Sequence, residues 1–544
     1  MRPRPLPLVL CLLAAPLAAR EPDYDVLNRI RQEGFHESQV MELARHLTDH
    51  IGPRLTGSPG LRQANEWTRQ KFAEWGLAEA RLEPFEFGEG WSFSKASVRL
   101  VEPGTAVLRA QPKAWTPGTD GAVRGEVMRA KIEEEKDLEA LNGKVAGKIL
   151  LLDEPPEPKS PDEPVFDRHD EDDLAELAKY EIPDDEDDRE VWLERRRERI
   201  ALGRKRNAFL AEEGALATIE VSSFEHGVVR VTGGGNLGIP GEPVGVPALV
   251  MAVEPYSRLL RLLDDEVTPV LEIEVEAERH DETTQAFNTL AEIAGEGRKP
   301  EIVMAGAHLD SWHGGTGATD DGAGVVVVME AARILSSLGL EPRRSIRFAL
   351  WGGEEQGLLG SEAHVEEHFA HRPPSDEPEE RELPERYRRP GWPIEPKPDF
   401  ARFSVYLNID NGGGAVRGIW AQENLGAMKR FERWIEPLSD LGVTTVTMRE
   451  TGSTDHVPFD RVGLPGFQFI QDRRDYSTRT HHSDIDTYEH LSPEDLKQAS
   501  VVLASLLWQA ANDPQPFPRK PMPEEPEEEE ERKKDQNEET PATQ

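Results

Sequence analysis

Histidine and carboxylate residues follow the apolar runs of this sequence at points where predicted strands end. The run at residues 301–307 leads into His308, and Asp310 stands two residues later. A glycine-rich loop then leads to Asp320 and Asp321, just before an apolar helical pattern. One carboxylate would be enough to cap that helix. The second acid, so close to an imidazole, points instead to a metal site.

Three later segments repeat this arrangement. Glu354 and Glu355 follow the run at 345–351, Asp410 follows the run at 403–409, and the segment 480–487 contains His481, His482 and further acids. Because the carboxyl ends of parallel strands meet at one edge of a sheet, five segments are expected to deliver imidazoles and carboxylates to one rim. These nitrogen and oxygen ligands suit two zinc ions or a similar metal pair.

The elements that must position these residues alternate between strand and helix from residue 285 onward. We expect strands at 301–307, 345–351, 403–409, 443–449 and 466–470. We expect helices at 324–338, 358–369, 423–438 and 493–511, and one N-terminal helix at 63–75. This rhythm predicts an α/β fold, a three-layer αβα domain with a largely parallel mixed sheet and helices on both faces.

The pattern of apolar residues changes between the two parts of that domain. Short β-like runs recur across residues 118–278, which indicates a smaller inserted β-rich module, so that the α/β domain comprises residues 20–117 and 279–513. The charged insertion at 155–206 is expected to form a solvated helix on a surface loop. The second charged insertion at 372–400 and the disordered Pro/Glu-rich tail at 514–544 are both expected to be mobile.

Length and charge limit the classes of function. The chain has 544 residues, enough for several domains, and 64 Lys and Arg against 103 Asp and Glu give a net charge of −39. Nucleic acid and anionic membrane surfaces would repel such a protein, so neither is an expected partner. Its alternating apolar segments exclude a collagen-like or wholly disordered chain.

The N-terminus has the pattern of a secretory signal. Arg2 and Arg4 precede an apolar run, and small residues follow at 17–19, so residues 1–19 are interpreted as a cleaved signal peptide and the protein as secreted, periplasmic or extracellular. An N-terminal membrane anchor is the alternative, although the run is shorter than a membrane span requires. The single cysteine, Cys11, lies in this segment, so the mature chain would have no thiol chemistry.

Several motifs together resemble the co-catalytic di-zinc exopeptidases, the metallopeptidase family that includes bacterial leucyl aminopeptidases and glutamate carboxypeptidases. They are Ile51-Gly-Pro-Arg-Leu-Thr-Gly-Ser58, the segment from Ala307 to Trp312, Asp320-Asp-Gly-Ala-Gly324, and His481-His482-Ser483 with Asp486-Thr487. The likeness covers residues 40–110 and 285–512. The middle module resembles the protease-associated domain that these enzymes often carry.

The resemblance implies a role for each matching position. His308 and Asp410 would bind one zinc ion, Glu355 and His482 the other, and Asp320 would bridge the two. Glu354 would be the general base, and Asp310 would orient His308. The loop 452–459 matches the family's substrate-side loop, which makes Asp455 and His456 substrate-side candidates. Leucyl aminopeptidases carry an oxyanion-stabilising tyrosine at the position of Thr451, so the resemblance leaves the oxyanion partner of this chain open, with His456 as one candidate.

The implied activity is hydrolysis of dipeptides or of terminal residues of short peptides by a water that the two zinc ions activate. The acidic composition favours substrates with a free α-amino group. A glutaminyl cyclase-like single-zinc acyltransferase and a catalytically inactive receptor or scaffold of the same fold are the alternatives. The resemblance also raises the possibility of a homodimer, since relatives are often dimeric.

Overall fold

The computed structural model describes residues 22–157, 162–180, 186–296, 301–378, 380–381 and 383–525, without the side chains of 186–194 and 196. The predicted signal peptide at 1–19 and the glutamate run at 527–531 lie outside the described residues. None of the helices in the described ranges combines the length and apolar character that crossing a membrane requires.

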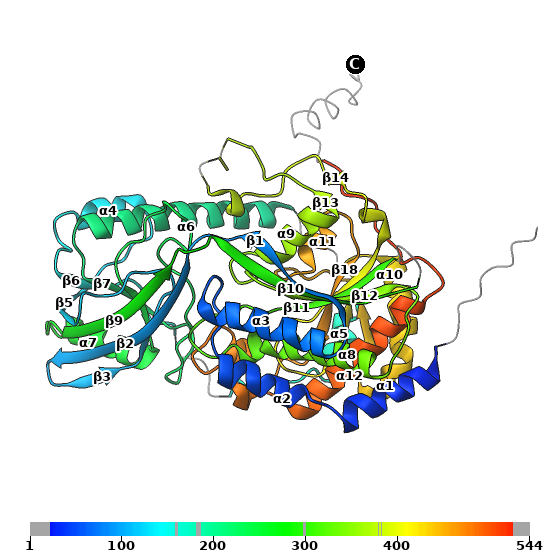
Figure 1. The fold of residues 1–544 in the computed structure, drawn as a ribbon. Coiled ribbons are helices and arrows are strands. Elements are labelled where there is room, and N and C mark those ends of the chain that lie inside the picture. Colours follow the sequence, from blue (N-terminus) through cyan, green and yellow to red (C-terminus); the bar gives the residue numbers. More distant parts are fainter. Residues whose placement is uncertain are drawn as a thin grey trace, which may run out of the picture.

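The main sheet has eight strands and is mixed (Figure 1). In spatial order they are β1 (Ala78–Glu86), β10 (Gln285–Ile293), β12 (Ser345–Trp351), β11 (Ile302–His308), β15 (Phe403–Asn408), β18 (Gly466–Gln471), β16 (Val416–Trp420) and β17 (Thr445–Thr447). The central strands β12, β11, β15 and β18 run parallel, whereas β1 and β10 are antiparallel additions at one edge. The expectation of an α/β protein with a largely parallel mixed sheet is confirmed.

Helices cover both faces of this sheet because its central strands are apolar on both sides. All seven residues of β11 are buried, and they alternate between two cores: Val303 and Ala305 belong to one, Ile302 and Met304 to the other. The first core is completed by α1 (Tyr24–His36), α2 (Val40–Arg45), α3 (Pro59–Glu74), α8 (Ala323–Ser337), α10 (Leu425–Ile435) and α12 (Pro493–Asn512). The second is completed by α9 (Leu359–His368) and α11 (Val457–Asp460).

A second eight-stranded sheet, also mixed, lies at the other end of the molecule (Figure 1). Its strands in spatial order are β3 (Ala106–Leu108), β2 (Gly90–Glu102), β9 (Val270–His280), β5 (Val123–Arg129), β6 (Lys148–Leu151), β7 (Ala217–Val221), β8 (Ala248–Met251) and β4 (Ala110–Pro112). The helices α4 (Glu135–Leu141) and α7 (Val253–Asp264) accompany it. The sheet begins at Gly90 rather than at residue 118, because β2 pairs along its length with β9.

The first charged insertion contains α5 (Glu171–Leu177) and the long helix α6 (Glu186–Glu212). Helix α6 is not wholly solvated, because Leu210 is buried and Arg204 pairs with Glu242. The second insertion follows the short strand β13 (Ala370–His371) and carries the short strand β14 (Glu395–Pro396). Its Arg389 pairs with Glu380 at 2.5 Å.

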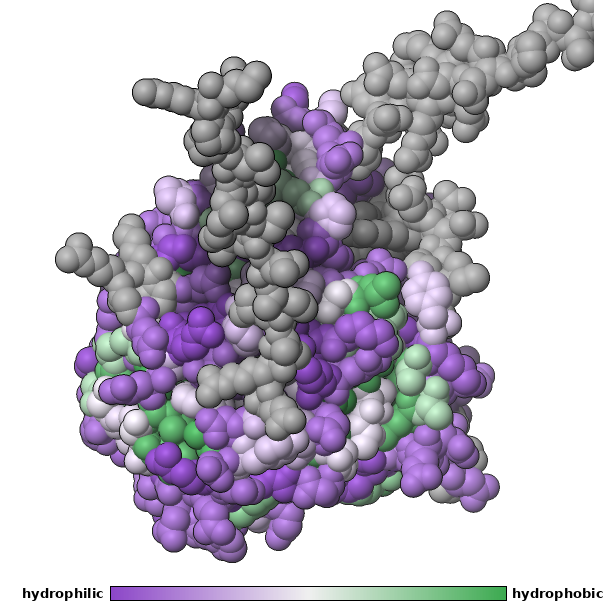
Figure 2. All heavy atoms as spheres, turned by 90° about the vertical axis from the view of Figure 1, so that its right-hand side faces the viewer, coloured by the Kyte–Doolittle hydropathy of each residue, from purple (hydrophilic) through white to green (hydrophobic). Residues whose placement is uncertain are grey.

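The tail differs from its sequence-based prediction up to residue 525. Phe517 is 7% exposed and packs against Phe431, Trp434 and Phe467, at ring-centroid distances of 5.5, 5.6 and 5.5 Å. One aromatic residue in an otherwise Pro/Glu-rich segment is enough to dock it, and composition averaged over the tail hides that residue. The face shown in Figure 2 is mostly hydrophilic with scattered apolar residues, as the net charge leads one to expect.

Candidate metal centre and active site

The predicted site residues lie at the carboxyl ends of the parallel strands of the main sheet. His308 is the last residue of β11, Glu354 and Glu355 follow β12, and Asp410 follows β15. His482 enters from the segment after the short helix at Tyr476–Thr480. All five line one cavity of about 1050 Å³, together with Asp320.

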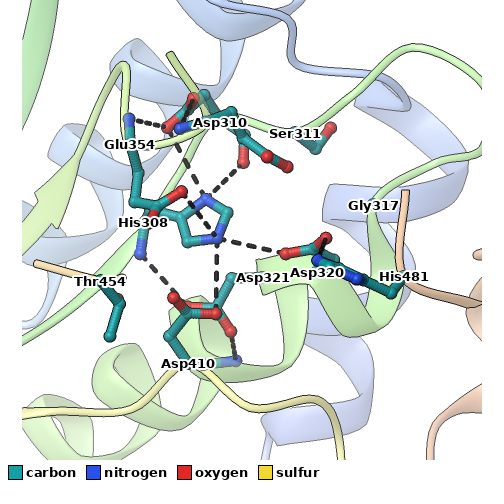
Figure 3. A network of polar contacts seen from close by, with 12 residues as sticks. His308, Asp310, Ser311, Gly317, Asp320, Asp321, Glu354, Asp410, Thr454 and His481 are labelled. Carbon is teal, nitrogen blue, oxygen red and sulfur yellow. Dashed lines mark hydrogen bonds and ion pairs between the residues drawn. The ribbon is translucent and has the colours of Figure 1, made fainter. Parts of the chain in front are cut away.

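Asp320 joins the two halves of this group, and Figure 3 shows its carboxylate between His308 and His481. Its Oδ1 lies 3.3 Å from Nε2 of His308, and its Oδ2 lies 3.3 Å from Nε2 of His482. Each imidazole also lies near a second carboxylate. His308 Nε2 is 3.6 Å from Asp410 Oδ1, and His482 Nε2 is 3.1 Å from Glu355 Oε2. Two groups of possible metal ligands therefore share Asp320, namely His308, Asp320 and Asp410, and Asp320, His481 and His482. The five predicted ligands are called the metal group below: His308, Asp320, Glu355, Asp410 and His482.

The residues present fit a metal ion. Asp320 Oδ2 and Glu355 Oε1 are buried oxygens without a hydrogen-bond donor, which is costly unless a cation binds them. Burial, reinforced by neighbouring carboxylates, raises the pKa of both Glu354 and Glu355 well above the usual range. Imidazoles and carboxylates without a thiol are a donor set that suits zinc.

His308 presents Nε2 to this group because its other ring nitrogen is fixed. Its Nδ1 donates a hydrogen bond to the backbone carbonyl of Asp310 at 2.9 Å, which leaves Nε2 as a lone-pair donor. The carboxylate of Asp310 bonds elsewhere, because it accepts hydrogen bonds from the backbone N–H groups of Glu354 (3.2 Å) and Glu355 (3.3 Å). Asp310 thus orients His308 through its backbone and the two glutamates through its side chain.

The motif at 51–58 holds the loops that carry the site. Arg54 is fully buried, and its guanidinium donates to the carbonyls of Leu309 (2.7 Å), Thr316 (2.7 Å) and Gly317 (2.8 Å). Burial lowers the pKa of Arg54 to about 10. Thr56 donates to the Asp310 carboxylate at 3.0 Å. This motif therefore positions the loops after β11.

Asp486 fixes the backbone around Asp320. It accepts hydrogen bonds from the N–H of Thr319 at 2.8 Å and from the N–H of Asp320 at 3.1 Å. Asp321 plays a similar part, since its carboxylate accepts from the N–H groups of His308 (3.2 Å) and Gly324 (3.1 Å). Both acids therefore hold backbone positions next to the metal ligands His308 and Asp320.

The two substrate-side candidates do not line the cavity. Asp455 and His456 are fully buried; Ser361 donates to the Asp455 carboxylate at 2.5 Å, and His456 Nε2 donates to the carbonyl of Thr451 at 2.9 Å. Burial raises the pKa of Asp455 to about 8 and lowers the pKa of His456 to about 4. The residues at this loop that do line the cavity are 451–454, so the loop faces the cavity with small residues.

Of two further histidines near these motifs, His481 lines the cavity and His313 does not. His313 lies away from the cavity, where its Nε2 donates to the carbonyl of Pro112 at 2.6 Å. His481 stacks on His482 at a centroid distance of 3.7 Å, and its Nε2 is 3.8 Å from Asp320 Oδ2. His481 is thus a possible further ligand next to the metal group, with its Nε2 farther from Asp320 Oδ2 than that of His482 (3.3 Å).

Tyr476 is a cavity residue that the sequence did not single out. Its ring lies 4.9 Å from that of His481 and packs against Gly412, where a β-carbon would come within 2.9 Å of the tyrosine side chain. Six arginines also line the cavity, four of them from the insertion at 372–400. No motif marked Tyr476 or these arginines, because their place at the cavity depends on how segments far apart in the sequence pack together.

Comparisons with known proteins agree with this geometry. Residues 288–507 match the model of peptidase family M28. Carboxypeptidase Q of Mus musculus is 25% identical over 489 residues, covering 89% of this chain and 88% of that protein. The similarity therefore extends well beyond the segments that carry the metal group.

Two solved structures share the fold. A peptidase M28 precursor from Shewanella amazonensis has a TM-score of 0.65 at 23% identity, covering 92% of this chain and 99% of that one. A zinc aminopeptidase from Bacillus subtilis has a TM-score of 0.53 at 19% identity, with coverage of 87% and 95%. The matched residues 288–507 contain all of the predicted metal ligands, so this part of the chain resembles peptidase family M28, and the chain is a metallopeptidase.

Proposed function

We propose that this protein is a secreted di-zinc exopeptidase that hydrolyses dipeptides or terminal residues of short peptides. His308 and Asp410 would hold one zinc ion, Glu355 and His482 the other, with Asp320 shared between them. The observation that carries the proposal is the position of Asp320, with one carboxylate oxygen 3.3 Å from each of the two imidazoles.

The zinc ions, when bound, supply Lewis-acid polarisation of a carbonyl and lower the pKa of water toward neutrality. Glu354 is the general base in this proposal. Its carboxylate lines the cavity with Oε2 4.0 Å from His308 Nε2, and its backbone is fixed by Asp310. Glu354 would accept a proton from water at the carboxylate and return it to the leaving amine.

Tyr476 is proposed as the donor to the carbonyl oxygen of the scissile bond, in place of His456. It lines the cavity beside His481, whereas His456 is buried behind the loop at 451–454. Burial raises the pKa of the Tyr476 phenol well above its usual range. The hydroxyl therefore stays protonated at neutral pH and can donate a hydrogen bond to developing negative charge.

The second sheet is proposed to be a protease-associated-like module that walls the cavity. Thr232, Gly233 and Leu237, which lie between its strands β7 and β8, line the cavity. A site enclosed in this way admits a chain end more readily than the middle of a folded chain.

Zinc content and activity together test the proposal. The purified chain should contain about two zinc equivalents, lose hydrolysis of dipeptides when a chelator removes them, and regain it when zinc is returned. An active preparation without zinc, or rapid internal cleavage of an unfolded protein, would refute a zinc exopeptidase. N-terminal sequencing of protein exported by a bacterial host tests secretion, with Arg20 as the expected first residue.

A further inference from the structure

Away from the carboxylates around the metal group, the lining of the cavity is positively charged, whereas the whole molecule is negatively charged. Apart from the carboxylates around the metal group, the cavity is lined by two glutamates, Glu362 and Glu380, and by six arginines: Arg197, Arg372, Arg386, Arg388, Arg389 and Arg461. The chain as a whole carries a net charge of −39. A concentration of guanidinium groups at one cavity of so acidic a protein calls for a functional reason.

Several of these arginines already face carboxylates. Arg389 pairs with Glu380 at 2.5 Å and also with Glu377. Arg372 and Arg461 lower the pKa of Glu362, which burial raises, so these two charges are close to an acid. The arginines at positions 386 and 388 have different surroundings.

Arg386 and Arg388 bond to neutral backbone oxygens. Arg386 donates to the carbonyls of Phe87 (3.2 Å) and Leu237 (2.6 Å), and Arg388 donates to the carbonyls of Leu383 (3.1 Å) and Arg381 (3.2 Å). In the described part of the chain, no carboxylate lies within ion-pair distance of either guanidinium. Carbonyl groups fix the two cations in place without neutralising them.

The half-buried position of Arg386 makes its missing counter-charge costly. Its Nε is buried without an acceptor, and burial lowers the pKa of the guanidinium. The group is held rigid between the aromatic faces of Phe87 and Tyr387, at 5.6 and 5.4 Å from the ring centroids. A fixed and desolvated guanidinium binds a carboxylate with little loss of conformational entropy.

We propose that Arg386 and Arg388 bind a carboxylate of the peptide substrate while the scissile bond lies at the metal group. This inference rests on the proposed peptidase function and names its substrate class, peptides with a negative charge at or near their carboxyl end. It differs from the preference for an α-amino group that the overall composition suggested, because charge near the substrate acts more strongly than the screened charge of a distant surface. The carboxylate belongs to the terminal α-carboxyl group or to an acidic side chain.

Paired substrates distinguish these two sources. The first pair is a dipeptide with a free carboxyl terminus and the same dipeptide with a terminal amide. The second pair has Glu or Gln as the residue after the scissile bond, in amidated peptides. In at least one pair, the charged substrate should have a KM roughly 10- to 100-fold lower than its neutral partner. This is the effect of one or two charge-assisted hydrogen bonds. Equal KM values within both pairs would overturn the proposal.

Two variants assign the effect to the arginines. Arg386→Gln and Arg388→Gln should each reduce the preference for the charged substrate by about tenfold, through KM, with zinc content retained. Arg386→Lys should recover part of the preference. Arg381→Gln is the matched control, since this arginine of the same insertion is 60% exposed and faces Asp376. An unchanged preference in both Gln variants contradicts the assignment, and testing both guards against misfolding of one.

Binding separates this inference from the proposed function. Calorimetric titration of free L-leucine and of L-leucinamide into zinc-loaded Glu354→Gln protein requires no turnover. Tighter binding of leucine that Arg386→Gln removes supports recognition of an α-carboxylate even if no peptide is hydrolysed. If peptides are hydrolysed but neither substrate pair is discriminated, the peptidase function stands and the carboxylate inference fails.

Discussion

Glu354 and Glu355 are neighbours in sequence with different surroundings. The Glu355 carboxylate lies 3.1 Å from His482, whereas Glu354 is 4.0 Å from His308, the nearer imidazole. The same Asp310 carboxylate holds both backbones, so the difference in role comes from the direction of each side chain. This geometry supports Glu354 as the base and Glu355 as the ligand.

Replacing Glu354 with Gln should therefore retain zinc and reduce kcat by roughly 10²-fold or more, because the shape remains and the base is lost. His482→Ala should instead lose zinc, since it removes an imidazole from the metal group. Metal analysis of both purified variants, with kcat measured on one dipeptide, checks the pair. Equal loss of zinc in the two variants would make Glu354 a ligand rather than the base.

Tyr476→Phe tests the proposed carbonyl donor. The substitution keeps the ring against Gly412 and His481 and removes the hydroxyl alone, so kcat should fall by about 10²-fold with little change in KM or in melting temperature. Steady-state kinetics and a thermal melt measure both. An unchanged kcat would show that another group donates to the carbonyl oxygen.

Among the secondary-structure elements, helix α9 is hydrogen-bonded to strand β1 through a partly buried polar cluster. The Glu83 carboxylate accepts from His364 Nδ1 at 2.6 Å and from His368 Nε2 at 2.8 Å, and the Arg81 guanidinium lies 3.5 Å away. Glu83 and the two histidines also form a possible group of metal ligands. The short hydrogen bonds and the nearby arginine favour a structural cluster instead. Burial would raise the pKa of Glu83, but the two imidazoles outweigh it and hold that pKa well below its usual range.

Glu83→Gln should lower the free energy of unfolding by about 1–3 kcal/mol at pH 7, because a charged acceptor of two hydrogen bonds is lost. A carboxylate with a depressed pKa in the folded state stabilises fully above its unfolded pKa, near 4.3, and this stability is lost as the pH falls further. Urea unfolding of wild type and variant between pH 7 and pH 3 should show the difference shrinking below about pH 4. A difference that grows on acidification would contradict this account.

Across the molecule as a whole, the C-terminal segment holds distant elements together. Phe517 packs on α10 and β18, Arg519 donates to the carbonyl of Phe403 at 2.6 Å, and Lys520 pairs with Asp460 at 2.8 Å. Ending the chain after Pro516 should lower the melting temperature by roughly 5 °C or more, through the lost burial of Phe517. Ending it after Glu525 keeps all of these contacts and serves as the control. Equal melting temperatures for the two truncated chains would show that the docked segment adds no stability.

The central sheet and the metal group could be predicted from the order of residues alone. The apolar runs of β11, β12, β15 and β18 are too continuous to be anything but buried parallel strands, and their carboxyl ends must share one edge. His308, Glu355 and Asp410 therefore had to meet. Residue type and spacing along the chain were sufficient because each of these residues lies within a few positions of a strand end.

The surroundings of that group depend instead on long-range packing. Arg386, Arg388 and Tyr476 line the cavity because segments remote in sequence fold over the sheet edge, while Asp455 and His456 turn behind it. The docking of Phe517 and the pairing of β2 with β9 arise in the same way. Such contacts join positions far apart in the chain. They therefore cannot be predicted from the local sequence pattern, which reveals only a strand or the end of a strand.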